Sequence, residues 1–516
     1  MNMMKPKPRL SPLRRGILWV SLLAFVLQPM AAMAQVIATP GGLYKPSIEA
    51  AANGVPIVQI VTPSAAGVSR NQYEQFNVAA QGLILNNSPV LVQTQQAGWI
   101  SGNANLIGSP ARIILNEVNS KLPSDLRGYM EVAGQKAEVI VANPNGITCN
   151  GCGFINTSRG LLTTGTPVFG ASGSLDAFRV TGGSIAINGA GLNDTSTEQI
   201  DLIARAVQVN AAIWGKNLNV IAGANQVAYP DLATQSINTS EAAPTVAIDV
   251  AALGGMYANK IRLIGTEAGV GVASAGTLAA QAGDLRIDSA GRITLANTST
   301  TQASGRIDLT AQQDINNSGT SYAQGAAQLS SATQITNTGL LGAKGDLTLS
   351  AANIDSSGTL AAGMAADASI GNDGKLSLNA SNTLSNSGQN LAGNAISFKA
   401  GTLNLANSQT RSNASIDLSA SGDIDHRKGD LSATGALRIT AGGTLQNEGA
   451  ALSANNFDLS VGGLTNRGGT ISAQGPSTLT SQGSIDNSQA GFIGSNASLT
   501  LSTGTCLLYT SPSPRD

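Results

Sequence analysis

The sequence predicts an all-β fold in which short strands stack into a β-helix. Only 11% of the 516 residues are charged and 3% are aromatic, whereas 60 are Gly. From about residue 276, a unit of short alternating strands and Asn-Ser-Gly-type turns recurs, and Gly305, Gly325 and Gly345 begin successive units. A period near 20 residues with strand alternation and no helical spacing is typical of a β-solenoid.

Stacking accounts for the composition. A single coil cannot bury its apolar face, but stacked coils share one core and pair each strand with the coils before and after it. Gly supplies positive φ at corners, and Asn both tolerates left-handed backbone and stacks into ladders. Charges repeating about every 4.8 Å would repel one another. The net charge of −1 offers no basic field for nucleic acid.

Residues 1–34 have the pattern of a cleaved signal peptide. Basic residues precede the apolar run GILWVSLLAFVL, and AMAQ then offers a small-x-small cleavage site between Ala34 and Gln35. The alternative is a membrane anchor, but the run is short for spanning a bilayer. The sequence therefore predicts export from the cytoplasm through the Sec translocon.

The other end of the chain departs from the repeat. Residues 276–504 are predicted to form the β-helix repeats, whereas CLLYTSPSPRD has neither their alternation nor their composition. We interpret residues 505–516 as a non-native tail, such as a translated linker, and the alternative is a genuine short tail. The natural protein is then expected to be much longer.

Residues 35–275 are less regular and carry a series of motifs. In chain order these are AAGVSRNQYEQFNV, GLILNNS, ISGNANLIG, ARIILNEVNS, VIVANPNGITCNGCGFINTSRGLLTTGTP, NLNVIAGANQV and LGGMYANKIRLIGTEAGVGV. Together they resemble the secretion domain of the filamentous haemagglutinin family, the large exoproteins of bacterial two-partner secretion. The resemblance implies a right-handed parallel β-helix, exported through the periplasm of a Gram-negative bacterium and recognised by an outer-membrane β-barrel transporter.

The resemblance also implies which residues matter for secretion. The family's N-P-N-G-I motif is intact as Asn143, Pro144, Asn145, Gly146 and Ile147. Its N-P-N-L motif appears as Asn103, Ala104, Asn105 and Leu106, where Ala replaces Pro and loses the fixed φ of the turn. The NxYxxFNV element matches Asn71, Tyr73, Phe76, Asn77 and Val78. We expect these motifs to take part in transporter recognition.

Cys149 and Cys152 form a C-x-x-C that several chemistries could use. A thioredoxin-like site needs a helix in a βαβ pattern, which the sequence does not predict. A zinc site needs four ligands, and only His426 and Cys506 remain, both remote in sequence. A local disulfide in an oxidising compartment is the favoured interpretation, with a pair of free thiols as the alternative.

Three functions are compatible with these patterns to different degrees. The first is a secreted or surface-exposed adhesin that binds a receptor on a host or neighbouring cell. The alternative is the N-terminal stalk of a contact-dependent growth inhibition toxin whose toxic domain lies beyond this fragment. The third, a β-helical enzyme, is disfavoured because the acids are scattered, and DIDHRKGD (423–430) is interpreted as a solvated loop. No catalytic residues, metal or cofactor are expected within the chain.

Overall fold

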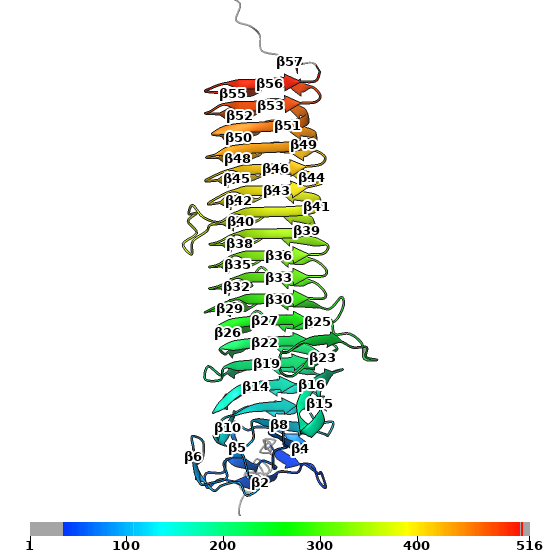
Figure 1. Cartoon of the computed structure of the whole chain (residues 1–516), viewed down its shortest axis with the longest axis vertical. Coiled ribbons are helices and arrows are strands. Elements are labelled where there is room, and N and C mark those ends of the chain that lie inside the picture. Colours follow the sequence, from blue (N-terminus) through cyan, green and yellow to red (C-terminus); the bar gives the residue numbers. More distant parts are fainter. Residues whose placement is uncertain (1–34, 107, 506, 509–516) are drawn as a thin grey trace, which may run out of the picture.

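The chain forms a long rod of stacked β-strands (Figure 1). The computed structural model describes residues 35–106, 108–505 and 507–508. The predicted signal peptide (1–34) and most of the predicted tail (505–516) lie outside these residues. Apart from one short 3-10 turn at Ala171–Gly173, the regular elements described are β-strands. The prediction of an all-β parallel β-helix is confirmed.

Two of the three faces of the rod belong to one 32-stranded sheet. The first face is a parallel stack that runs through β4 (Val68–Phe76), β8 (Ile113–Val118), β11 (Ala137–Ala142), β14 (Thr157–Thr163), β19 (Gln199–Ala204), β22 (Asn217–Ala222), β27 (Lys260–Gly265), β30 (Leu285–Ser289), β33 (Ile307–Ala311), β36 (Ala327–Ser331), β39 (Leu347–Ser356), β41 (Leu376–Asn386), β43 (Ile396–Ala400), β46 (Ile416–Ala420), β49 (Ala436–Gln446), β51 (Asn456–Thr465), β53 (Ser477–Ser481) and β56 (Leu499–Thr503). The strands β39, β41, β49 and β51 also pair with the second face, which joins the two faces into one sheet.

The second face is also parallel. It runs through β9 (Ser124–Leu126), β12 (Ile147–Cys149), β17 (Ser184–Ile187), β20 (Ala206–Val209), β25 (Val246–Val250), β28 (Gly271–Ser274), β31 (Ile293–Leu295), β34 (Ile315–Asn317), β37 (Gln334–Asn337), β44 (Thr402–Asn404), β47 (Ile424–Asp425), β54 (Ile485–Asp486) and β57 (Leu507–Leu508). In β57, Leu507 and Leu508 pair with Ile485 and Asp486, so this part of the predicted tail continues the stack.

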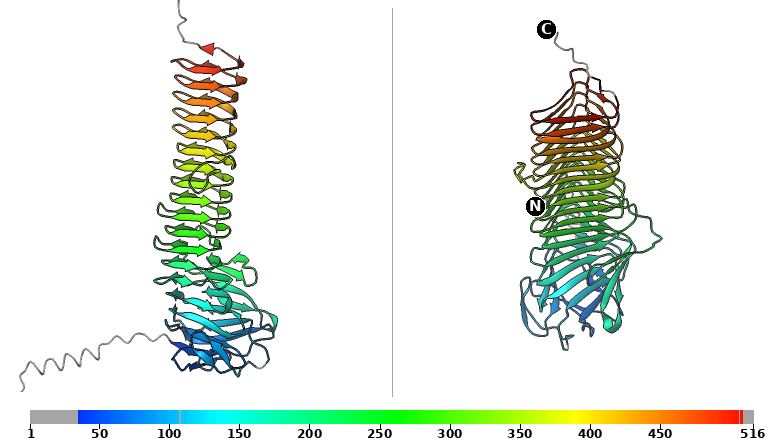
Figure 2. Two further views of the ribbon diagram at one scale, coloured as in Figure 1. Left: turned by 90° about the vertical axis from the view of Figure 1, so that its left-hand side faces the viewer. Right: turned by 45° about the horizontal axis from the view of Figure 1, so that its top comes forward.

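The third face is a 14-stranded parallel sheet. It runs through β18 (Leu192–Asn193), β21 (Ala212–Trp214), β26 (Gly255–Ala258), β29 (Thr277–Ala280), β32 (Thr300–Ala303), β35 (Thr320–Ala323), β38 (Leu340–Ala343), β40 (Thr359–Ala362), β42 (Gln389–Ala392), β45 (Gln409–Ser412), β48 (Asp430–Ala433), β50 (Ala451–Ala454), β52 (Thr470–Ala473) and β55 (Phe492–Ser495). Figure 2 shows the even spacing of these coils along the rod. Alternate side chains of all three faces point inward and form one continuous core.

Two kinds of corner hold successive coils in register. The N–H of Gly325 donates to the carbonyl of Gly305 at 2.8 Å, and the N–H of Gly345 donates to Gly325 at 2.9 Å. At another corner, buried amides form ladders in which each Nδ2 donates to the next coil. The amide of Asn447 donates to Asn466 at 2.7 Å, and Asn466 donates to Asn487 at 2.7 Å. The predicted Asn ladders are therefore present. Gly305, Gly325 and Gly345 do not have the predicted positive φ; glycine is needed there because a Cβ at Gly325 would lie 2.8 Å from the carbonyl oxygen of Gly305.

The N-terminal end departs from the simple rod. Strand β1 (Val36–Ala38) pairs antiparallel with β4, and five strands form a separate sheet there: β2 (Ser47–Ala50), β3 (Pro56–Gln59), β5 (Leu83–Asn87), β10 (Tyr129–Gly134) and β13 (Gly153–Ile155). A two-stranded hairpin joins β6 (Val92–Thr94) to β7 (Gly98–Ile100). An antiparallel side sheet of β15 (Thr166–Phe169), β16 (Leu175–Val180), β23 (Asn225–Ala228) and β24 (Thr234–Ser236) covers a second apolar cluster. The sequence did not predict this side sheet.

Candidate functional site

The N-P-N-G-I motif forms a tight turn at the end of β11. The side-chain oxygen of Asn143 accepts the N–H of Asn145 at 3.0 Å, and its backbone carbonyl accepts the N–H of Gly146 at 3.1 Å. The Nδ2 of Asn143 donates to the carbonyl of Leu122 and to Ser124 Oγ, both at 2.9 Å. Asn143 is fully buried, so its amide ties the turn to the preceding coil.

The N-A-N-L motif forms the same turn. The side-chain oxygen of Asn103 accepts the N–H of Asn105 at 3.0 Å, and its carbonyl accepts the N–H of Leu106 at 3.2 Å. The Nδ2 of Asn103 donates to the carbonyls of Ile60 and Asn86. The turn therefore forms with Ala104 in the place of Pro, because the asparagine amide supplies the bonds that define it.

Each turn divides into a buried part and an exposed part. Pro144 and Asn145 are exposed, whereas Ile147 continues into the core as the first residue of β12. In the other turn, Ala104 is exposed, Asn105 is half-buried and Leu106 is buried. Gly146 has φ +111°, a conformation that L side chains rarely adopt, so this position needs glycine. The exposed middle of each turn is the part that a partner protein could contact.

The NxYxxFNV element lies inside the domain. The Oδ1 of Asn71 accepts the N–H of Val61 at 2.9 Å, and the hydroxyl of Tyr73 donates to Asn116 Oδ1 at 3.0 Å. The Tyr73 and Phe76 rings pack at 4.8 Å, and burial raises the pKa of Tyr73 well above its usual value. Val78 is also buried. These side chains hold the first coils together and are covered in the folded domain.

Asn77 of the NxYxxFNV element lies at a hollow that adjoins the N-P-N-G turn. Its Oδ1 accepts the N–H of Asp125 at 2.8 Å, and its own N–H donates to the carbonyl of Gln35 at 3.3 Å. A cavity of about 410 Å³ opens beside it, lined by residues that include Leu122, Asp125 and Thr148. Leu122 also accepts the Asn143 amide, so this hollow adjoins the N-P-N-G turn. Ala34 of the predicted cleavage site lies outside the described residues.

Cys149 and Cys152 are joined by a disulfide, and both are fully buried. Cys149 is the last residue of β12 and pairs with Leu126 of the preceding coil. Cys152 forms an isolated parallel backbone pair with Leu192, the first residue of the third face. Between them, the side chain of Asn150 accepts the N–H of Ala190 from the next coil at 2.9 Å. The C-x-x-C thus lies in a corner that stacked coils enclose, next to the N-P-N-G turn.

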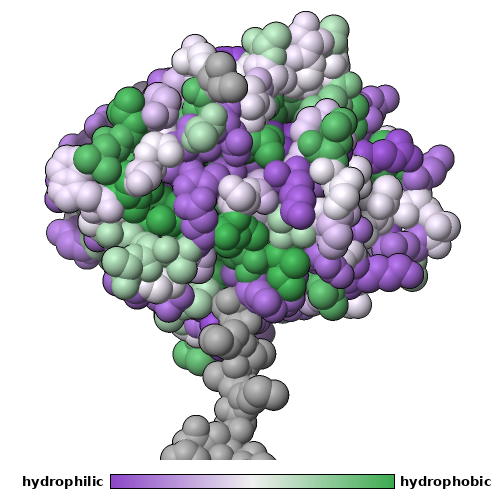
Figure 3. All heavy atoms as spheres, turned by 90° about the horizontal axis from the view of Figure 1, so that it is seen from below, coloured by the Kyte–Doolittle hydropathy of each residue, from purple (hydrophilic) through white to green (hydrophobic). Residues whose placement is uncertain are grey.

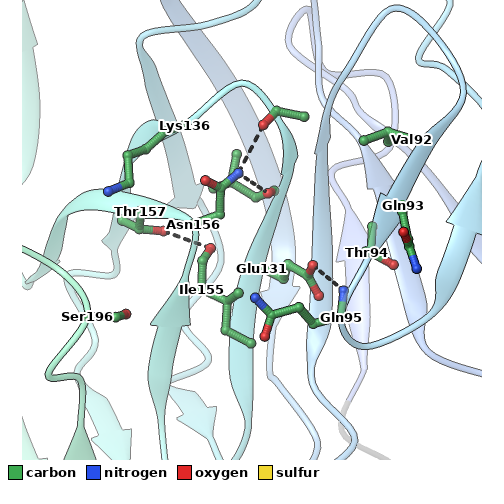
Figure 4. Close-up of a pocket in the computed structure, with 12 residues that line it drawn as sticks. Val92, Gln93, Thr94, Gln95, Glu131, Lys136, Ile155, Asn156, Thr157 and Ser196 are labelled. Carbon is green, nitrogen blue, oxygen red and sulfur yellow. Dashed lines mark hydrogen bonds between the residues drawn. The ribbon is translucent and has the colours of Figure 1, made fainter.

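A larger hollow, of about 770 Å³, lies between β6, β10 and β13 in the N-terminal region (Figure 4). The buried Glu131 carboxylate accepts the N–H groups of Gln95 and Gln96 at 2.6 and 2.9 Å. The amide of Asn156 donates to backbone carbonyls, and Lys136 extends away from Glu131. Because the carboxylate is bound by backbone donors, it fixes the β6–β7 hairpin to the coil rather than facing the hollow as a free acid.

The N-terminal end of the rod also exposes apolar side chains. Leu43 is 86% exposed, and Val90, Leu91 and Trp99 are each 65% exposed. Viewed from below, this end shows apolar patches interleaved with polar ones (Figure 3). Exposed apolar surface of this kind marks a contact site on a soluble domain. The composition of residues 35–275 gave no signal for it, because isolated apolar residues in turns look like core residues.

The sequence also did not predict a buried ionic cluster. The guanidinium of Arg159 donates to the fully buried Asp201 carboxylate at 2.5 Å and lies 4.6 Å from the Tyr229 ring centroid. The Tyr229 hydroxyl donates to the Glu138 carboxylate, and burial raises the Tyr229 pKa strongly. Because Tyr229 directly follows β23, this cluster fastens the side sheet to β14 and β19 of the rod.

His426 is buried, contrary to the interpretation of residues 423–430 as a solvated loop. Its Nδ1 lies 2.8 Å from Asn447 Oδ1, and the Asn447 amide donates onward to Asn466, so Nδ1 carries the donating hydrogen. The solvated interpretation holds for its exposed neighbour Arg427, which pairs with Asp425. The inward position of His426 arises because it occupies the same corner as the ladder asparagines.

Among residues 35–106, 108–505 and 507–508, no group of three or more His, Cys, Asp or Glu side chains could hold a metal ion. Over the same ranges, the structure contains no helix of the length and apolarity needed to cross a bilayer.

Comparisons with known proteins give matches for both parts of the chain. Residues 34–295 match the TPS secretion domain, and overlapping segments between 282 and 489 match the haemagglutinin repeat. The chain is 49% identical over 458 residues to the tRNA nuclease CdiA-2 of Burkholderia pseudomallei (strain 1026b), covering 86% of this chain and 14% of that protein. It is 45% identical over 454 residues to Toxin CdiA of Yersinia pestis, covering 87% of this chain and 14% of that protein.

A solved structure of the filamentous haemagglutinin secretion domain is also similar. It has a TM-score of 0.50 and 32% identity, and the match covers 57% of this chain and 96% of that one. The resemblance inferred from the motifs is thereby confirmed. Proteins with this domain are secreted or cell-surface proteins of Gram-negative bacteria, and they rely on an outer-membrane transporter. The chain belongs to the TPS secretion domain family of two-partner secretion exoproteins, and its secretion domain leads into haemagglutinin repeats.

Proposed function

We propose that this chain is the export domain and the first part of the stalk of a contact-dependent growth inhibition toxin. The observation that carries the proposal is the 49% identity over 458 residues with a protein named a tRNA nuclease, together with the match to Toxin CdiA. The chain spans 14% of the length of each of these relatives. A toxic domain would therefore lie beyond the repeats, and residues 35–504 would export and display it.

In this proposal, residues 1–34 direct the chain to the Sec translocon, and residues 35–275 engage the transporter from the periplasm. The motif residues then act in two ways. Asn71, Tyr73, Asn103 and Asn143 are buried, so they support recognition by holding the coils in shape. Pro144, Asn145 and Asn105 present their exposed or half-buried atoms to the transporter. Residues 276–504 form the repeats that extend the rod.

A secretion assay tests this division between buried residues that support the fold and exposed residues that contact the transporter. Cells that co-express the chain with its transporter should release the wild-type chain and retain variants with an altered Asn145. The control variant is Asn188→Ala, because Asn188 follows β17 and lines the same hollow as Asn77 but belongs to neither motif; it should be released like the wild type. Equal release of Asn145→Ala and wild type would contradict direct recognition through the exposed turn. Failure of the wild type to be released with any co-expressed transporter would contradict the export function itself.

A second candidate, an adhesin, is favoured by a different observation. The secretion domain matches the solved filamentous haemagglutinin domain at 32% identity, and the repeats match the haemagglutinin repeat. An adhesin would use the same export domain, and its rod would bind a receptor on a host or neighbouring cell. The two candidates differ in the sequence that follows the repeats.

Reading the gene through and beyond codon 505 separates them. A distinct terminal domain followed by a small open reading frame supports the toxin, because a toxin-producing cell needs an immunity protein. A competition culture then checks the activity: producers should reduce the count of target cells only where cells touch. Continued repeats without such a frame would support the adhesin instead.

A further inference from the structure

Beyond Leu192, the solvent-facing aromatic side chains lie on the third face of the rod. Beyond Leu192, the aromatic residues of the described chain that are not buried are Trp214, Tyr257, Tyr322 and Phe492. All four lie on the 14-stranded sheet, in β21, β26, β35 and β55. Because aromatic residues are only 3% of the chain, their gathering on one face is a specific feature. Trp214 and Tyr257 lie in adjacent coils and form one local apolar platform, whereas Tyr322 and Phe492 lie singly, farther along the rod.

Trp214 and Tyr257 stack on each other. Their ring centroids are 4.3 Å apart and the ring planes differ by 13°, and the two residues are register partners in adjacent coils. The rings therefore stack along the rod axis, at close to the coil spacing of about 4.8 Å. A methyl group at Gly255 would lie 2.7 Å from the Tyr257 ring, so this ring rests over the glycine and is held in place.

The stack stops abruptly at Ala279. Tyr257 pairs with Ala279, and Ala279 pairs with the exposed Gln302, so these three outward positions follow one another along the axis. Trp214 covers one face of the Tyr257 ring, and only small side chains stand beyond the other face. These are Ala279, the register partner of Tyr257, and Thr277, the register partner of Gly255. Two coil steps, about 9.6 Å, separate Tyr257 from Gln302. One ring seated over Ala279 would lie about 4.8 Å from each of them.

The surroundings of this slot over Ala279 are polar and uncharged. Thr277 and Thr300 occupy the adjacent outward column, and Gln302 offers an amide. The strands of this face from β18 to β42 contain no Asp, Glu, Lys or Arg, whereas β27, β30 and β33 of the first face carry Arg262, Arg286 and Asp308. An uncharged face suits an uncharged ligand, because a charged one would lose hydration without gaining a counter-charge.

The slot has a boundary at its C-terminal side. Tyr322 follows Gln302 in the column, and its hydroxyl donates to the carbonyl of Met364 at 3.0 Å. Met364 lies in the loop between β40 and β41, and its side chain lies over Gly342, where an added Cβ would be 2.1 Å from the Met364 methyl carbon. This loop closes the column after Tyr322. The open part of the column is therefore one coil position between Tyr257 and Gln302, which suits one ring rather than a long fibre.

We propose that the slot over Ala279 binds a neutral saccharide, with one pyranose ring stacked on the free face of Tyr257. The C–H groups of a pyranose carry a partial positive charge that complements the negative face of an aromatic ring. Its hydroxyl groups match the donors and acceptors of Thr277, Thr300 and Gln302. The site lies on a different face from the secretion motifs, so it adds a ligand to the exported rod and does not depend on transporter recognition.

A saccharide titration of the wild-type chain and of a variant with a larger side chain at Ala279 tests the proposal. The purified chain is titrated with hexasaccharides of β-1,4-glucose, α-1,4-glucose and β-1,4-N-acetylglucosamine, and binding is followed by saturation-transfer NMR. At least one probe should bind saturably to the wild type. Ala279→Tyr continues the aromatic stack and should weaken binding by about tenfold or more. Ser432→Tyr places the same ring at the equivalent position of a distant coil and should leave binding unchanged.

Three outcomes would overturn the proposal. These are no saturable binding of any probe, equal binding by the wild type and Ala279→Tyr, or equal losses in Ala279→Tyr and Ser432→Tyr. Sedimentation adds another: if Ala279→Tyr dissolves a dimer of the wild-type chain, the slot is a contact between copies. Circular dichroism establishes that each variant remains folded. Secretion of Ala279→Tyr should equal that of the wild type, so the export function and the saccharide site are judged separately.

Discussion

Asn103 and Asn143 occupy equivalent places in two turns of the secretion domain. In each case, the side-chain oxygen accepts the N–H two residues ahead at 3.0 Å, while the amide donates to carbonyls of other strands or loops. The residue that follows is Ala104 in one turn and Pro144 in the other, and it is exposed in both. The asparagine therefore defines the turn, and the next position is free to vary.

Substitution within the N-P-N-G turn should separate folding from recognition. Asn143→Ala removes the bonds to Leu122 and Ser124 and leaves buried polar atoms without partners, so the free energy of unfolding should fall by about 1–3 kcal/mol. Asn145→Ala removes the bonds that the exposed amide donates to the carbonyl of Ser120 and to Asn143 Oδ1, and it should cost only about 0.5–1 kcal/mol because water can replace them. Urea titration of the purified chain measures both. Similar losses for the two variants would show that Asn145 is also structural.

Replacing Ala104 by Pro should stabilise the domain. The turn already matches that of Pro144, and the N–H of Ala104 has no hydrogen-bond acceptor among the described residues, so Pro removes no bond. The smaller freedom of the unfolded chain should add about 0.4–1 kcal/mol. The reciprocal Pro144→Ala should lose a similar amount. Thermal and urea unfolding measure both changes, and a destabilised Ala104→Pro chain would mean that the two backbones differ.

Breaking the cluster that holds the side sheet should be costly. Arg159→Met leaves the Asp201 carboxylate buried with only the neutral donors Gln199 and Asn219, which should cost about 3–5 kcal/mol. The double variant with Asp201→Asn should recover much of that loss, because no fully buried charge remains and Glu138, which also loses Arg159, is partly exposed. Arg286→Met, which breaks an exposed pair with Asp288, should cost about 1 kcal/mol or less. Equal losses for Arg159→Met and Arg286→Met would contradict the role of burial.

Reducing the disulfide between Cys149 and Cys152 should have a modest effect. The bridge closes a very short loop, for which the chain-entropy relation gives about 2 kcal/mol. Urea titrations equilibrated with and without dithiothreitol measure the difference. Because both cysteines are fully buried, reduction of the folded chain should also be much slower than reduction in urea. Rapid reduction without denaturant would show that this corner opens locally.

His426 should make the stability fall in mild acid. Burial lowers its pKa in the folded chain, and Nε2 is buried without a partner, so the folded state resists the second proton. The unfolded chain takes up that proton near its ordinary pKa of about 6.5. The stability contributed by the neutral ring is present above that pH. It is lost as the pH falls from about 6.5 toward the lowered folded pKa, by at most about 1.4 kcal/mol per pH unit.

The matched variant is His426→Asn. Its amide can donate to Asn447 as the ladder asparagines do, and it does not titrate. The difference in unfolding free energy between wild type and His426→Asn should therefore change with pH below about 6.5 and stay constant above it. A difference that is flat across this range would show that His426 takes up its proton as readily in the folded chain as in the unfolded chain.

The repeat region was predictable because its coils are regular. Gly305, Gly325 and Gly345 recur every 20 residues in sequence, and in the structure their backbones bond directly to one another. Alternation placed Leu and Ile on the inside without any knowledge of long-range contacts. Short N-x-N motifs also carried their turn geometry locally, through the asparagine side chain.

The remaining features depend on contacts that sequence spacing hides. Trp214 and Tyr257 stack although 43 positions separate them, because the side-sheet strands β23 and β24 interrupt the coil that joins them. Arg159 and Asp201 meet across a similar interruption, by β15 and β16. His426 looked solvated because charged residues flank it, yet the preceding strand turns it to the ladder corner. In each case, the register of stacked coils decided the contact.

The direction of the backbone hydrogen bonds has a mechanical consequence. Strands of successive coils are bonded parallel to the rod axis, so a pull applied to its two ends loads these bonds in tension rather than in shear. Such bonds open one strand at a time, and a coil at the end of the rod peels before those behind it are strained. Each released coil of about 20 residues lengthens the chain by up to about 70 Å. Under load, the protein should therefore yield in discrete steps and act as an extensible tether.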